Sequence, residues 1–172
     1  KVRTEDGSHY YIASNRVSAV FEGLGTYEVV GTVKGRELVG KKYKHFFDFY
    51  NEAPEVKASK NAFHTVAADY VSVDDGTGIV TINGAFGEID FESAKKNNLP
   101  IFVNVNTDGT FTKETGPYAG MYVKEAERKI ADDLKQRGLL LRKDPIRHSY
   151  PHCWRCDTPL LNYATKSWFI RV

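Results

Sequence analysis

Short segments rich in β-branched and aromatic residues, each ended by a turn, fill the first two-thirds of the chain. Such segments are typical of short strands rather than of long helices. We expect strands over residues 10–13, 27–33, 62–73, 79–82 and 101–105. Between the third and fourth of these lies Asp-Asp-Gly-Thr-Gly at 74–78. Its glycines can adopt positive φ, so we expect the two flanking strands to pair as a hairpin.

The clearest helix is predicted over residues 122–137, because its apolar residues recur at spacings of three and four. They are Val123, Ala126, Ile130 and Leu134. Gly138 is a natural stop for this helix. Shorter helices are expected over 88–97 and over 16–22, the latter capped by Asn15. Short strands with a few helices predict an α+β domain built on a small β-barrel, with a few packed helices and a C-terminal connecting tail.

Composition argues against several classes of protein. The net charge of +2 is too small to indicate a polyanionic partner by itself. No run of about 18 apolar residues occurs, so we expect no transmembrane helix and no membrane partner. The chain has two cysteines, whereas a secreted disulfide scaffold would carry more. We therefore expect a monomer in a reducing compartment, the cytoplasm.

The two cysteines, Cys153 and Cys156, form one Cys-x-x-Cys. The pair could supply two thiolates to a zinc ion, which needs about four ligands. The others would then come from His148 and His152 or from outside this chain. The pair could instead be a redox motif, although the strand–motif–helix setting of such motifs is absent. It could also be two reduced thiols on a β-knuckle.

The most distinctive motifs of the sequence lie in its C-terminal stretch. Residues 148–155 are His-Ser-Tyr-Pro-His-Cys-Trp-Arg, and residues 164–172 are Ala-Thr-Lys-Ser-Trp-Phe-Ile-Arg-Val. This stretch closely resembles the segment where class I isoleucyl-tRNA synthetases return from an inserted editing domain to the catalytic domain. Earlier segments that match the family in order are 27–40, 65–80 and 108–138. The resemblance implies an editing domain over 1–146 and a connecting segment over 147–172.

The resemblance also implies a function. Editing domains of this family hydrolyse valine wrongly attached to tRNA(Ile), and valyl-adenylate is a second candidate substrate. The partners are therefore the tRNA(Ile) acceptor end and mischarged valine, with water as the nucleophile and no cofactor for editing. ATP, Mg²⁺ and the ligation of isoleucine belong to the parent catalytic domain, whose nucleotide-binding signatures are missing here. Cys153 and Cys156 would be half of a structural zinc (Zn²⁺) site, which a second cysteine pair completes in the intact enzyme.

Site residues follow from the same resemblance. Asp90 aligns with the aspartate that binds the substrate's α-ammonium group, and it is the predicted catalytic residue. A carboxylate suits this role because it forms a charge-assisted hydrogen bond with an ammonium. Gly76, Thr77 and Gly78 are expected to shape the substrate pocket, where glycines let a ribose or phosphate approach the backbone. From the residues alone, Asp90 could instead serve the first turn of the following helix, and the glycines could serve only the hairpin.

Two features depart from the family pattern. Thr81, a predicted substrate-binding residue, stands where the family has a histidine that helps to exclude isoleucine, and Asn83-Gly84 stands where it has Ala-Pro. A threonine hydroxyl is smaller than imidazole and does not titrate near neutral pH. Discrimination between valine and isoleucine could therefore be relaxed or rebuilt. The family's threonine-rich strand precedes the first residue of this chain, so we do not expect hydrolysis by this fragment alone.

Two other functions stay open. The chain could be a module that binds the acceptor end of tRNA with weakened or lost hydrolysis, as Thr81 and Asn83-Gly84 suggest. It could also be a structural zinc-ribbon protein centred on Cys153 and Cys156, in which case removal of zinc should unfold it. Deacylation assays separate the first alternative from an editing hydrolase, and metal analysis separates the second.

Overall fold

The computed structural model describes residues 1–145, 149–168 and 170. The chain divides into two compact units. The first unit contains residues 1–44 and 63–82, and the second contains residues 45–62 and 83–172. Each unit has its own secondary structure and its own buried residues. The predicted division of the chain between residues 146 and 147 stays a prediction.

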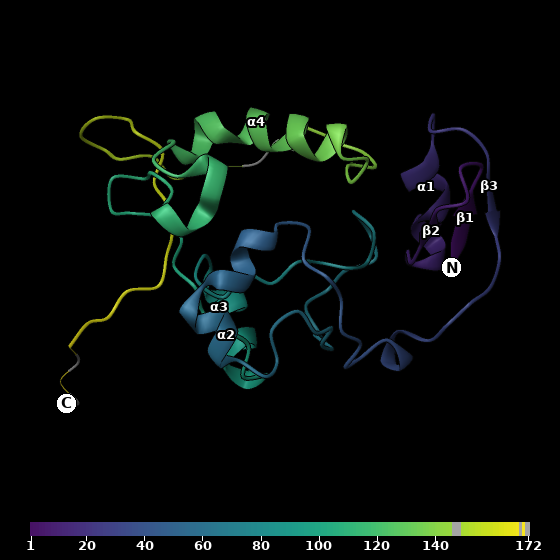
Figure 1. Cartoon of the computed structure of the whole chain (residues 1–172), viewed down its shortest axis with the longest axis horizontal. Helices are drawn as coiled ribbons and strands as arrows, with labels where there is room; N and C mark the ends of the chain where they lie inside the picture. Colours follow the sequence, from purple (N-terminus) through teal and green to yellow (C-terminus); the bar gives the residue numbers. More distant parts are fainter. Residues whose placement is uncertain (146–148, 169, 171–172) are drawn as a thin grey trace. The chain divides into compact units, whose positions relative to one another are not determined.

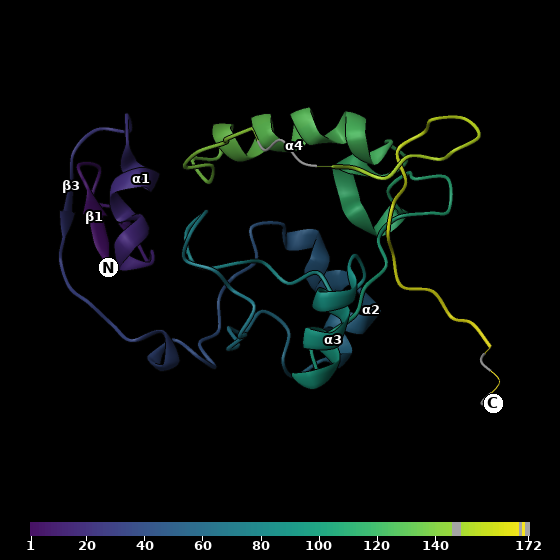
Figure 2. The same ribbon diagram turned by 180° about the vertical axis from the view of Figure 1, so that it is seen from behind.

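A three-stranded antiparallel sheet lies in the first unit (Figures 1 and 2). Its strands are β1 (Val2–Thr4), β2 (His9–Tyr10) and β3 (Tyr27–Val29), in the order β2-β1-β3. Val2, in the central strand, pairs with Tyr10 on one side and with Val29 on the other. Strands β2 and β3 confirm in part the predicted segments 10–13 and 27–33, and both are shorter than expected.

Helix α1 (Val17–Phe21) supplies the aromatic core of the first unit and confirms the predicted helix over 16–22. It continues from a 3-10 turn, η1 (Ser14–Arg16). Phe21 is buried, and its ring stacks on Tyr27 at 4.9 Å between centroids and meets Tyr10 edge-on at 5.8 Å. A helix of five residues is too short to be stable in isolation. Packing of Phe21 against β2 and β3 therefore stabilises it.

The predicted capping role of Asn15 is wrong. Asn15 lies inside η1, and no side chain caps α1. The side-chain amide of Asn15 instead donates a hydrogen bond to the carbonyl oxygen of Val73 at 3.1 Å. Asn15 thus connects the start of the helix to a loop far along the chain, rather than satisfying the helix's own first N–H groups.

The predicted hairpin formed by segments 62–73 and 79–82 is also wrong. Neither segment forms a strand, and the first contributes a single bridge, between His64 and Lys42. The side chains of the second segment are mostly exposed. A β-branched sequence stabilises a strand mainly through packing against cross-strand neighbours. Apart from the short pairing of residues 63–65 with residues 40–43, neither segment is paired along its length, so these residues remain loops.

The named elements in the second unit are all helices. Its α-helices are α2 (Pro54–Ala58), α3 (Glu88–Lys96) and α4 (Val123–Gln136). Its 3-10 segments are η3 (Asp48–Glu52) and η4 (Lys113–Tyr118), and η2 (Gly35–Glu37) belongs to the first unit. The predicted helices 88–97 and 122–137 are confirmed as α3 and α4. The predicted strand 101–105 is reduced to one bridge, between Val105 and Phe111.

Aromatic rings form the core of the second unit. Phe47 is 8% exposed and stacks on Phe49 at 5.2 Å, and Tyr118 meets Phe47 edge-on at 5.5 Å. Tyr50 packs at 4.8 Å from Phe49, and its hydroxyl accepts a hydrogen bond from the side-chain amide of Asn104 at 2.6 Å. Such ring pairs contribute about 0.5–1.5 kcal/mol each beyond the burial of their surface. This aromatic core therefore stabilises the second unit.

Tyr118 is expected to make stability depend on alkaline pH. Its hydroxyl donates to a carboxylate oxygen of Asp133, and burial, together with that carboxylate, raises the pKa of Tyr118 from 10.0 to about 12. Because the pKa is higher in the folded state, this stabilisation is complete below pH 10.0 and is lost as the pH rises through about 12. Tyr118→Phe should therefore lower the free energy of unfolding by about 1.5 kcal/mol near neutral pH. The decrease should be smaller at high pH. Urea denaturation of both proteins across this range measures the difference, and a difference independent of pH would contradict the prediction.

The fold class is α+β, as predicted. In the part of the chain that the structure describes, the sheet has three strands and is open, rather than closed into the predicted small barrel. None of the described helices combines the length and the apolar character needed to cross a membrane.

Candidate functional site

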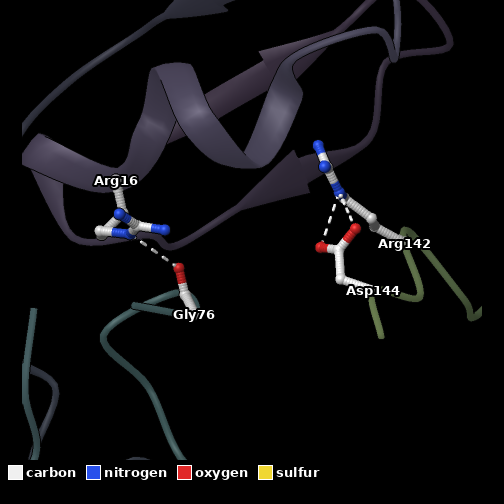
Figure 3. A network of polar contacts seen from close by, with 4 residues as sticks. All are labelled: Arg16, Gly76, Arg142 and Asp144. Atoms are coloured by element: carbon white, nitrogen blue, oxygen red, sulfur yellow. Dashed lines mark hydrogen bonds and ion pairs between the residues drawn. The ribbon is translucent and has the colours of Figure 1, made fainter. Parts of the chain in front are cut away.

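The turn at 74–78, predicted to shape the substrate pocket, is held in the first unit by residues next to and within η1. Arg16 donates from Nε to the carbonyl oxygen of Gly76 at 3.2 Å (Figure 3). The backbone N–H of Ala13 donates to the carbonyl oxygen of Thr77 at 2.8 Å. The turn is therefore a loop docked on the start of α1, not the tip of a hairpin.

Gly78 has to be a glycine in this turn. Its φ is +73°, and a Cβ atom there would lie 2.5 Å from the Cβ of Ala13. The hydroxyl of Thr77 is also engaged locally, since it donates to the carbonyl oxygen of Ile79 at 3.0 Å. Gly78 and Thr77 thus have a structural role in the docked turn, which is not the hairpin considered as the alternative. A role of Gly76, Thr77 and Gly78 in binding substrate stays a prediction.

The predicted substrate-binding residues are divided between the two units. Gly76, Thr77, Gly78 and Thr81 belong to the first unit, and Asp90 belongs to the second. Thr81 is exposed and lies in no helix or strand, so its side chain is accessible. In the second unit, Asp90 is the candidate whose surroundings are best defined.

Asp90 is the third residue of α3, and its carboxylate reaches back to the loop before the helix. Its Oδ2 accepts the backbone N–H of Asn83 at 3.1 Å. Helix α3 has no side-chain cap, and Glu88 and Asp90 are the acidic residues of its first turn, where the helix dipole stabilises negative charge. Asp90 therefore has the structural role considered from the sequence. Because that bond uses Oδ2, the Oδ1 of this partly exposed carboxylate can accept a further donor.

Loop 83–87 is fixed from both sides. The N–H of Phe86 donates to the carbonyl oxygen of Asn83 at 2.9 Å, which closes a turn within the loop. From the C-terminal segment, the N–H of Ala164 donates to the carbonyl oxygen of Ala85 at 2.7 Å. Ala85 is fully buried. The backbone that presents the donor to Asp90 is thus held in one position.

Cys153 and Cys156 lie in a tight turn near the C-terminus. The N–H of Cys153 donates to the carbonyl oxygen of Thr158 at 2.9 Å, and the N–H of Asp157 donates to the carbonyl oxygen of Cys153 at 2.8 Å. Hydrogen bonding with Thr158, and to a lesser extent with Cys153, lowers the pKa of the exposed Cys156 thiol. The geometry is that of a β-knuckle that carries two free thiols.

The described residues supply at most two of the ligands that a structural zinc site needs. Structural zinc takes about four ligands, and Cys153 and Cys156 provide two thiols. Among the residues that the structure describes, no group of three or more His, Cys, Asp or Glu side chains is placed to hold a metal ion. The Nδ1 of His152 lies 3.0 Å from the carbonyl oxygen of Tyr150. His148, the other candidate ligand, lies outside the described residues.

Comparison with known proteins identifies the family. The chain is 45% identical over 168 residues to isoleucine–tRNA ligase of Clostridium novyi, and 44% identical over 167 residues to that of Clostridium acetobutylicum. It is 41% identical over 175 residues to isoleucine–tRNA ligase of Natronomonas pharaonis. These matches cover 98%, 97% and 100% of the chain.

The chain belongs to the isoleucine–tRNA ligase family.

It spans about 15% of the length of the curated ligases that it matches. No protein-family model matches the chain. Because the match to the Natronomonas pharaonis ligase covers the whole chain, it includes both units and every predicted site residue. The matched range therefore includes the docked turn at 74–78, Asp90 and the cysteine knuckle.

Two contacts of this ligase segment escaped prediction from the sequence. The hydrogen bond between Asn83 and Asp90 depends on a loop folding back onto its own helix, and the bond between Ala164 and Ala85 joins segments far apart in the chain. Gly84 gave a partial signal, because the resemblance described in the sequence analysis implies that Asn83-Gly84 departs from the family pattern just before a helix. The sequence did not show what this glycine contacts.

Proposed function

We propose that this segment is the editing domain of an isoleucine–tRNA ligase and hydrolyses valine from mischarged tRNA(Ile). The observation that carries the proposal is the placement of Asp90, with Oδ2 bonded to Asn83 and Oδ1 able to accept a donor from a ligand. A free α-ammonium group is the feature that an aminoacyl ester presents to such a carboxylate. The match to isoleucine–tRNA ligases supports the same assignment.

The similarity of isoleucine and valine explains why an isoleucine–tRNA ligase needs a hydrolytic site. Isoleucine and valine differ by one methylene group, and a hydrophobic pocket discriminates between them by only about 1–3 kcal/mol. A second site that admits the smaller product and hydrolyses its ester supplies the remaining accuracy. In this proposal Thr81 occupies the position at which isoleucine would be excluded, and Gly76, Thr77 and Gly78 bind the substrate through backbone that a ribose or phosphate can approach closely.

Asp90 would bind and orient the ester rather than attack it. With the ammonium held at Oδ1, the ester carbonyl would be fixed relative to a water molecule, and orientation of this kind lowers the barrier without a covalent intermediate. Hydrolysis of this type needs no cofactor. Valyl-adenylate carries the same ammonium group and is a second candidate substrate.

The remaining activities belong to the full-length protein. Ligation of isoleucine to tRNA(Ile) with ATP and Mg²⁺ would occur in a separate catalytic domain, in the cytoplasm. The tRNA(Ile) acceptor end would reach this segment from there. Cys153 and Cys156 would provide two of the roughly four thiolates of a structural zinc site, completed by residues elsewhere in the protein.

Deacylation by the full-length protein tests the proposal. tRNA(Ile) is charged with valine and, separately, with isoleucine, and release of each amino acid is followed over time. We expect valine to be released about 10- to 200-fold faster than isoleucine, the range that one methylene group can provide in an apolar pocket.

Two results would contradict the proposal. If both esters survive while the charged tRNA still binds, the segment is an acceptor-end binding module, and Thr81 marks the loss of hydrolysis. If both esters are hydrolysed at equal rates, the site does not discriminate, and an editing function is wrong.

A further inference from the structure

Gly84 is buried between loop 83–87 and helix α3. A Cβ atom at this position would lie 2.6 Å from the Cβ of Ala94 and 3.3 Å from the Cγ1 of Ile101. Ala94 is fully buried, and its Cβ is attached directly to the helix backbone. It therefore cannot turn away as a long side chain would, and any side chain at Gly84 would push the loop and the helix apart.

The distance between loop and helix controls the contact to Asp90. The N–H of Asn83, the residue next to Gly84, donates to Oδ2 of Asp90 at 3.1 Å. Hydrogen bonds of this kind occur at about 2.7–3.2 Å and weaken steeply when the geometry is distorted. A displacement of several tenths of an ångström would therefore break this bond. The released carboxylate would then rotate away from its present direction.

We propose that Gly84 and Ala94 form a matched pair that positions Asp90 for the substrate's α-ammonium group. This inference rests on the proposed editing function and names Gly84 as a positioning residue of that site. Absence of a side chain at 84 lets the loop contact α3, and the small side chain at 94 fills the space that remains. Contact between the loop and α3 fixes the hydrogen bond from the N–H of Asn83 to Oδ2 of Asp90. This bond directs Oδ1 of Asp90 to the substrate.

The test uses the full-length protein with the substitution Gly84→Ala. Its substrates are tRNA(Ile) carrying valine and tRNA(Ile) carrying the α-hydroxy analogue of valine, which lacks the ammonium group. We expect the KM for the valyl ester to rise about tenfold, which corresponds to the loss of one well-oriented charged hydrogen bond. The KM for the hydroxy ester should change little, because this ester gains nothing from a correctly directed carboxylate.

A second substitution makes the pair itself testable. The double variant Gly84→Ala/Ala94→Gly moves the methyl group from the helix to the loop and removes the 2.6 Å contact. We expect it to recover most of the lost affinity for the valyl ester. Gly35→Ala is the matched control, because Gly35 has no positive φ and a Cβ atom added there would meet no neighbour within 4 Å.

Asn83→Pro covers the case in which Gly84→Ala does not fold. Proline lacks the N–H that bonds to Asp90, and it leaves the space beside Ala94 unfilled. The same selective rise in KM for the valyl ester is expected. Equal losses on both esters, or a double variant that recovers nothing, would overturn the positioning role of Gly84. The editing function itself fails separately, if the unaltered full-length protein leaves both the valyl and the isoleucyl ester intact or hydrolyses them at equal rates.

Discussion

Asp90→Asn is expected to slow deacylation of valyl-tRNA(Ile) by the full-length protein about 10- to 100-fold, which matches the 1.5–3 kcal/mol of a hydrogen bond to a charged group. Asparagine has nearly the same shape, and its carbonyl oxygen can still accept the N–H of Asn83 that now bonds to Oδ2. The loop and the helix should therefore keep their positions. What is lost is the negative charge that binds the ammonium group in the proposed function. Single-turnover deacylation at saturating and subsaturating enzyme separates the binding loss from any loss of rate.

Glu88→Gln is the control for this experiment. Glu88 shares the first turn of α3 with Asp90 and interacts with the same helix dipole, but its side chain is exposed. Removing its charge should leave deacylation nearly unchanged. If Asp90→Asn and Glu88→Gln behave alike, both carboxylates only stabilise the helix, and the proposed role of Asp90 in substrate binding is wrong.

Phe47→Ala is expected to lower the free energy of unfolding by about 3–5 kcal/mol, the range found for aromatic truncations in a core. Phe47 is 8% exposed and contacts Phe49 and Tyr118 through stacked and edge-on rings. The guanidinium of Arg137 also lies 5.8 Å from its ring centroid. Truncation would therefore leave a cavity at the centre of the aromatic core. Urea denaturation followed by circular dichroism measures the change.

Phe46→Ala, at the neighbouring residue, is the control for the loss of stability expected from Phe47→Ala. Phe46 is 41% exposed, so its truncation removes less buried surface and leaves a smaller cavity. The carbonyl oxygen of Phe46, which accepts a hydrogen bond from Arg137, is retained in both variants. We expect a loss of about 1 kcal/mol. Equal losses for the two substitutions would show that the core is not centred on Phe47.

The helices were predictable because their signals are local. The apolar spacing within 122–137 and the stop at Gly138 place α4 at Val123–Gln136 almost without error. The same holds for α3, predicted at 88–97 and found at Glu88–Lys96. A 3.6-residue period is contained in the helix itself, so no distant partner is needed to recognise it.

The strands were harder to predict because a strand needs a partner. The segment 62–73 has the composition of a strand, yet the chain provides only an isolated bridge there, between His64 and Lys42. The turn at 74–78 has the residues of a hairpin turn, but Arg16 and Ala13 bind its carbonyl groups instead. Long-range contacts of this kind are not contained in any short window of sequence.

The candidate site also combines features that local sequence predicts with features that depend on long-range contacts. The role of Asp90 was predicted from its resemblance to a family residue and stays a prediction, whereas its expected position in the first turn of a helix is confirmed. The Asn83 bond, and the close contact between Gly84 and Ala94, depend on how a loop lies on that helix. In the sequence, Gly84 was singled out only through the family resemblance, whereas the structure shows that a Cβ atom there would lie 2.6 Å from the Cβ of Ala94.

The hydrogen bond from Ala164 to Ala85 has a consequence for the order in which the site is assembled during translation. Synthesis proceeds from the N-terminus, so loop 83–87 leaves the ribosome well before Ala164 does. During that interval loop 83–87 and the residues of α3 are already present, while the carbonyl group of Ala85 has no N–H from Ala164 to bond to. The nascent chain thus completes the surroundings of Asp90 only after its C-terminal segment has emerged.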